Sequence, residues 1–106
     1  MPKYLIAGTY TAEGAKGLMK DGGSARRAAV EQALKSLGGK LESFYFCFGP
    51  MDAFVIAEMP DNATAAALSL VTSAAGLVVV KTTVLLTPEE MDGAVKKSVN
   101  YRPPGK

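Results

Sequence analysis

The sequence predicts one α+β domain in the ferredoxin-like order β-α-β-β-α-β, followed by a C-terminal helix. The length of 106 residues fits a single domain. Strand-like runs and helical segments follow one another in that order, and the runs cover residues 4–10, 41–48, 52–59 and 77–86. All four runs are apolar on both faces. Helices on one side of such a sheet leave its other side uncovered, and a large uncovered apolar face usually marks an interface. We therefore expect two sheets to meet in a dimeric α+β barrel with a cavity between them.

The first strand, residues 4–10, leads directly into a helical region. The Thr11 hydroxyl is placed to cap the start of that region. A glycine pair at 22–23 divides it into a short first helix and a second helix that starts at Ser24. Apolar residues recur at helical spacing in the second helix, and the glycine pair at 38–39 ends it.

A hairpin is predicted next. Residues 41–48 should be a strand with Leu41, Ser43, Tyr45 and Cys47 on one face and Glu42, Phe44, Phe46 and Phe48 on the other. Residues 49–51, Gly-Pro-Met, supply a tight turn. Residues 52–59 then return as the partner strand.

A further helix is expected over residues 63–75, after the stop signal of residues 60–62, and Gly76 ends it. Its narrow apolar stripe predicts packing against the sheet and consists of Ala63, Ala67, Leu70, Val71 and Ala74. The fourth strand follows at 77–86. The sequence Thr-Pro-Glu-Glu at 87–90 is a strong helix start, and the last helix should run to about residue 99. The tail at 101–106 cannot be helical, and it either lies on a neighbouring subunit or remains loose.

Composition excludes several classes of function. Twelve Lys and Arg against ten Asp and Glu give a net charge of +2, and the cations are scattered, so nucleic acid is not an expected partner. One cysteine and no histidine exclude an internal disulfide and the usual metal ligands, so no metal and no cofactor are predicted. The chain starts without the pattern of a signal peptide, and its longest apolar run is broken by Lys81. We expect a cytoplasmic protein with no membrane contact.

The best candidate for a binding site is an anion site at residues 22–27, Gly-Gly-Ser-Ala-Arg-Arg. A glycine turn that opens a helix exposes backbone N–H groups, to which Ser24, Arg26 and Arg27 add donors. Two arginines in a first helical turn oppose the helix dipole, and a bound anion would relieve that cost. The alternative is that both arginines are solvated or pair with Asp21 and Glu31.

Other polar groups are candidates to line the cavity between two sheets. Tyr45 and Lys81 stand on predicted strands, and Asp52 begins the third strand. Burial would let Asp52 or Lys81 act as a base. The alternatives are that Asp52 caps a turn, that Lys81 faces water and that Tyr45 packs as an aromatic ring. Cys47 has no histidine to activate it and is expected to be a buried structural thiol.

Three segments, residues 4–14, 22–27 and 38–45, resemble the GYD domain family, and the likeness continues through 68–70, 81–83 and 85–90. The resemblance implies a small bacterial protein of unassigned function, similar in pattern to dimeric α+β barrels. The hairpin turn of that family usually carries Gly, Tyr and Asp. This chain keeps Gly49 and Asp52 but has no tyrosine between them, so a role of that tyrosine does not carry over.

Three functions remain open at this point. The first is a homodimer, or a higher even oligomer, that binds a small anionic metabolite between its sheets through Arg26 or Arg27. The second is an enzyme in which Asp52, Tyr45 or Lys81 transfers a proton on a carbonyl or aromatic substrate. The third is an assembly module whose cavity is filled by Phe44, Phe46 and Phe48.

Overall fold

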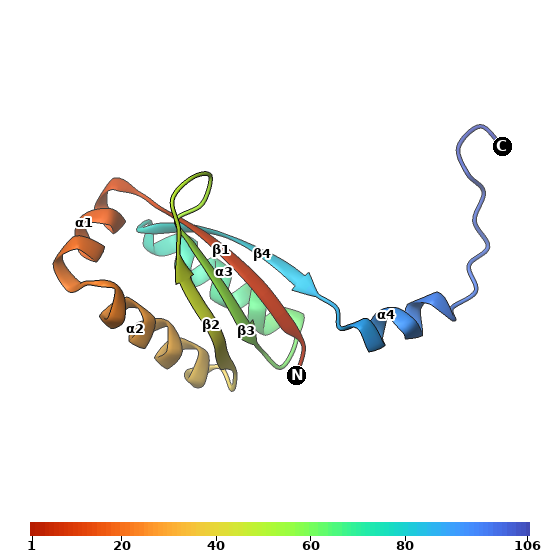
Figure 1. The fold of residues 1–106 in the computed structure, drawn as a ribbon, viewed down its shortest axis with the longest axis horizontal. Coiled ribbons are helices and arrows are strands. Elements are labelled where there is room, and N and C mark those ends of the chain that lie inside the picture. Colours follow the sequence, from red (N-terminus) through yellow and green to blue (C-terminus); the bar gives the residue numbers. More distant parts are fainter.

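The computed structural model describes residues 1–106 and contains four strands and four helices (Figure 1). Their order and bounds are β1 (Lys3–Tyr10), α1 (Ala12–Asp21), α2 (Gly23–Ser36), β2 (Lys40–Phe46), β3 (Ala53–Glu58), α3 (Asn62–Ala75), β4 (Val78–Leu85) and α4 (Pro88–Val95). The strands form one antiparallel sheet in the order β2-β3-β1-β4. The predicted ferredoxin-like α+β fold is therefore confirmed.

Helix ends follow local chemistry that is visible in the sequence. The side chains of Thr11, Asp61 and Thr87 cap α1, α3 and α4, and Glu90 completes a capping box at α4. Between α1 and α2, Gly22 has a φ of +84°, which other residues rarely adopt. This position therefore divides the helical region as the sequence predicted.

The core lies between the sheet and the helices on one of its faces. Tyr4, Leu34 and Met59 are its largest fully buried side chains. The Tyr4 hydroxyl donates a 2.7 Å hydrogen bond to Asn62 Oδ1, which satisfies its polar end at the start of α3. At the other end of the sheet, α1 is close to β4: a Cβ on Gly14 would lie 1.7 Å from the Leu77 carbonyl oxygen.

The strand β2 departs from the predicted alternation of faces. A bulge between Leu41 and Ser43 shifts the register, so that Leu41 and Phe44 both pack against the core. Phe46 lies against α2, where a Cβ on Gly23 would come within 2.9 Å of its ring. The prediction that Leu41 shares a face with Tyr45 was therefore wrong.

Several predicted boundaries also differ. The strand β2 ends at Phe46, so Cys47 belongs to the loop, where its N–H donates to the Asp52 carbonyl and its half-buried thiol donates to the Met51 carbonyl. The helix α4 ends at Val95, four residues before the predicted end. The expected packing stripe of α3 was wrong as well: Leu70 and Val71 are about 70% exposed, whereas Ala65 is buried.

The C-terminal part of the chain extends away from the body (Figure 1). Every residue from Pro88 to Lys106 is exposed. None of the helices has the length and apolar character needed to cross a bilayer.

Candidate ligand groove

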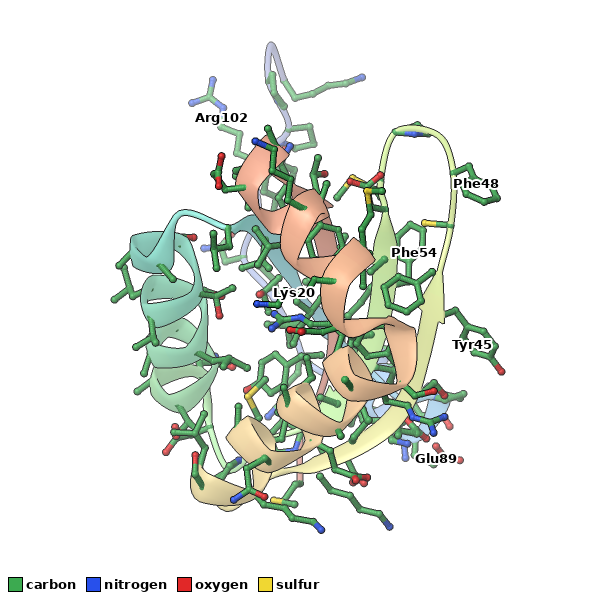
Figure 2. The ribbon with its side chains drawn as sticks, turned by 90° about the vertical axis from the view of Figure 1, so that its left-hand side faces the viewer. Lys20, Tyr45, Phe48, Phe54, Glu89 and Arg102 are labelled. Atoms are coloured by element: carbon green, nitrogen blue, oxygen red, sulfur yellow. The ribbon has the colours of Figure 1, made fainter.

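A groove of about 280 Å³ runs between α2 and α3 over the centre of the sheet. The helix α2 packs near β2 and α3 packs on β4, which are the two edge strands, so neither helix covers β1 and β3 fully. Figure 2 views the molecule from the side on which α3 and the α1–α2 segment stand apart. The sequence predicted a cavity between the sheets of two copies, whereas the cavity within a single chain lies on the helix-covered face.

Small side chains leave this space open. Gly8 and Ala53 lie on its floor, while Ala29 and Ala33 come from α2 and Ala75 from α3. Protein interiors pack closely, so small residues on facing elements leave a hollow unless the backbones approach one another. The larger lining groups are apolar and include Ile6, Phe44, Val55, Leu68 and Val80.

Arg26 is the only charged residue that lines the groove. Its Nε is buried and has no hydrogen-bond partner, and neither Arg26 nor Arg27 forms an ion pair within 4 Å. The predicted alternative of pairing with Asp21 or Glu31 is therefore not found. A buried guanidinium nitrogen without an acceptor is costly, and an anion at this point would remove that cost.

Arg26 also borders a second, smaller cavity of about 150 Å³ between α1 and α2. Tyr10 lines both cavities, and Asp21 lines the smaller one. The guanidinium thus stands where the apolar groove meets a more polar recess, which is the position expected of a group that holds the charged end of a ligand.

Hydroxyl groups are present on the α3 side of the groove, and each already has a partner. Ser69 Oγ and Thr82 Oγ1 lie 2.9 Å apart, and Thr72 Oγ1 donates to the Leu68 carbonyl at 2.7 Å. These bonds tie α3 to β4 and to itself. Arg26 Nε is therefore the buried polar atom of the groove that has no hydrogen-bond partner.

The six predicted site residues do not come together. Arg26 lines the groove, whereas Ser24 and Arg27 are exposed on α2 and do not line it. Tyr45 and Lys81 lie on the opposite, open face of the sheet, on the edge strands β2 and β4, and Figure 2 shows Tyr45 pointing outward.

Asp52 has a structural role at the end of the sheet. Its Oδ2 accepts a 2.9 Å hydrogen bond from the Tyr10 N–H, and its own N–H donates to the Gly8 carbonyl at 2.9 Å. The carboxylate therefore holds the β2–β3 connection against β1. This arrangement matches the alternative in which Asp52 caps a turn.

Two surface groups have displaced pKa values, and neither lines the groove. A hydrogen bond to Glu42 raises the pKa of Lys3. Hydrogen bonds from the Thr64 hydroxyl and N–H lower the pKa of Asp61, the cap of α3. Both shifts belong to local structural contacts.

The three phenylalanines that one hypothesis places in a cavity between two sheets do not fill the groove of the single chain. Phe44 lines it, Phe46 packs beside it against α2, and Phe48 is fully exposed at the hairpin loop (Figure 2). Sequence reasoning missed the role of Tyr10, Leu68 and the alanines of α2. The usable signal was the clustering of alanine on both helices, which was interpreted only in the helix at residues 63–75, and there as packing against the sheet.

The comparisons with known proteins give a family but no annotated relative. The model of the GYD domain matches residues 4–95, which is most of the chain. No curated protein and no solved structure matched the sequence. The match agrees with the resemblance carried by the residues 4–14, 22–27 and 38–45, and this chain belongs to the GYD domain family.

Proposed function

We propose that this protein binds a small molecule with an apolar body and one anionic group in the groove between α2 and α3. The observation that carries the proposal is the buried, unpartnered Nε of Arg26 at the edge of an otherwise uncharged groove. An anion would supply the missing acceptor, and the apolar walls would hold the rest of the ligand.

The size of the groove limits the ligand. Small-molecule sites span roughly 300–1,000 Å³, and this groove of about 280 Å³ is at the lower end. A carboxylate or sulfonate with up to three aromatic rings, or with a short alkyl chain, suits this volume. A long lipid or a dinucleotide does not.

The structure separates two neighbouring arginines that the sequence treated alike. Arg26 lines the groove and Arg27 is exposed on the same helix. Arg26→Gln and Arg27→Gln remove the same charge from adjacent positions, so they form a matched pair for testing the role of the groove.

The test uses anilinonaphthalene sulfonate, which has an aromatic body and one anionic group, and follows its fluorescence during titration. Loss of a hydrogen bond to a charged group costs about 1.5–3 kcal/mol, so Arg26→Gln should weaken binding about 10- to 100-fold. Arg27→Gln should bind the probe like the unmodified protein. Equal affinities of the two variants would contradict the assignment of Arg26.

A neutral probe separates the charge from the apolar groove. Phenylnaphthylamine has a similar body without the sulfonate, and its affinity should be the same in Arg26→Gln and the unmodified protein. Ala33→Phe places a ring into the groove and should weaken both probes. If Ala33→Phe left both affinities unchanged, the probes would bind elsewhere and the groove would lose its proposed role.

A further inference from the structure

The C-terminal arm, defined here as residues 86–106, carries apolar side chains that remain largely exposed. Leu86, Met91, Val95, Val99 and Tyr101 are between 49% and 77% exposed. In α4, Met91, Ala94 and Val95 follow helical spacing on one side, and Glu89, Glu90 and Asp92 carry the charge. An amphipathic helix of this kind normally gains its stability by packing its apolar side.

The whole chain exposes more surface than a compact protein of its mass. Its accessible area is 7509 Å², whereas a compact protein of this mass exposes about 5,700 Å². Its radius of gyration is 16.8 Å, against about 13 Å for a compact domain of this length. The excess area is roughly twice the 800 Å² or so that each partner buries in a standard interface.

The open face of the sheet is a second uncovered surface. Leu5, Ala7 and Ile56 lie at its centre, on β1 and β3, and are half-buried. Phe54 and Val79 lie beside them and are 40% and 54% exposed. Large apolar side chains gathered on one side of a sheet are typical of an interface.

A charge contact is available between Lys81 and α4. Lys81 lies on the open face of β4 and forms no ion pair, whereas Lys3 on the same face of β1 is already paired with Glu42. The helix α4 carries three carboxylates and no basic residue, and the four cations of the arm, Lys96, Lys97, Arg102 and Lys106, all follow α4. One side of α3 is also apolar and exposed. The helix α3 has no charged residue, so it has no cation to pair with the carboxylates of α4.

We propose that the C-terminal arm of one copy packs across the open sheet face of a second copy, and that the two copies exchange arms about a two-fold axis. Met91 and Val95 would cover the apolar centre of the partner sheet, with the carboxylates of α4 near Lys81. Both surfaces belong to the same chain, so a two-fold pair buries each of them twice. A second copy therefore accounts for the excess area with no further protein.

The first experiment measures the mass of the full-length protein in solution by light scattering after gel filtration. The unmodified protein should be a dimer at micromolar concentration. Met91→Lys with Val95→Lys puts two charges into the apolar side of α4 and should give a monomer. The control, Ser98→Lys with Asn100→Lys, adds the same charge to polar positions of the arm and should remain a dimer.

Every residue of α4 is exposed in the single chain, so the body should keep its helices and sheet in the monomeric variant, and circular dichroism should lose no more than the signal of α4. A monomeric unmodified protein would overturn the proposal. A dimer that survives Met91→Lys with Val95→Lys would overturn it as well.

A second experiment identifies the surface that receives the arm. In a Cys47→Ser background, chains with Met91→Cys are mixed with chains that carry either Lys81→Cys on the open face or Leu70→Cys on the outer side of α3. The mixed disulfide should form with Lys81→Cys at least tenfold faster than with Leu70→Cys. Faster coupling to Leu70→Cys would place the arm on α3 and refute the open-face contact.

Discussion

At the scale of single residues, Asp52 shows how a group with the chemistry of a catalytic base can serve the fold instead. Its carboxylate accepts the Tyr10 N–H, and its backbone bonds to Gly8 and Cys47. It therefore joins the end of β1 to the loop between β2 and β3. A catalytic base would need a free lone pair that faces the substrate. Asp52 does not line the groove, so it does not meet this condition there.

Replacing Asp52 with alanine should lower the free energy of unfolding by roughly 1–2 kcal/mol, because the Tyr10 N–H loses its acceptor. Asp52→Asn keeps an oxygen at the same place and should lose less than half of that amount. Urea unfolding of both variants measures the difference. Equal losses would show that the negative charge, rather than the hydrogen bond, is what the site requires.

Arg26 shows the limit of sequence reasoning at this scale. The motif at residues 22–27 pointed to an anion site and gave Ser24, Arg26 and Arg27 equal weight. Only the rotation of α2 about its axis distinguishes them, and that rotation is set by packing of Val30 and Leu34 on the core. The sequence contains the helix, but the direction of each arginine depends on its contact with the sheet.

At the scale of elements, α1 depends on a close approach to the start of β4. A Cβ at Gly14 would lie 1.7 Å from the Leu77 carbonyl oxygen, and the backbone cannot yield that space without moving the helix. Thr11 strengthens the same contact, since its N–H and hydroxyl both donate to the Leu77 carbonyl. The position of α1 also sets one wall of the smaller cavity beside Arg26.

Gly14→Ala should therefore destabilise the protein by about 3 kcal/mol, because overpacking forces α1 away from β4. Gly17→Ala is the matched control on the same helix. Nothing lies within 4 Å of its added methyl group, so it should stabilise the protein by about 0.5–1 kcal/mol through helix propensity. Thermal unfolding of the two variants should show shifts of opposite sign, and shifts of the same sign would contradict the close approach.

Element order was predictable because the local signals agree with the tertiary structure. Caps at Thr11 and Thr87 and the glycine pairs placed the elements to within a few residues. The bulge at Leu41 and Ser43 could not be predicted, since it serves to bring both Leu41 and Phe44 onto the core. The outward apolar side of α3 was missed for a related reason: apolar periodicity assigns a stripe but does not say which side faces the sheet.

At the scale of the whole molecule, the chain is a small body with a long uncovered arm. Only 11 of its 106 residues are buried, so association has much apolar surface to cover. The dimeric barrel that the sequence predicted stays a prediction here. The exchange of arms is a different arrangement of two copies, because α4 then covers the sheet face that a barrel would place against the partner sheet. Since the groove lies on the other face of the sheet, a dimer of this kind would leave both grooves accessible to ligand.

Folding coupled to association makes the unfolding midpoint depend on protein concentration. A tenfold rise in concentration stabilises a dimer by about 1.4 kcal/mol, which corresponds to about 4 °C in Tm for a unit of about 200 residues. We expect calorimetry at 10 and 100 μM to show this rise for the unmodified protein and for Ser98→Lys with Asn100→Lys. Met91→Lys with Val95→Lys should unfold at one temperature at both concentrations, because its arm no longer covers the partner sheet. A midpoint that stays constant in all three proteins would mean that each chain folds alone, and the open sheet face would then need another explanation than a second copy.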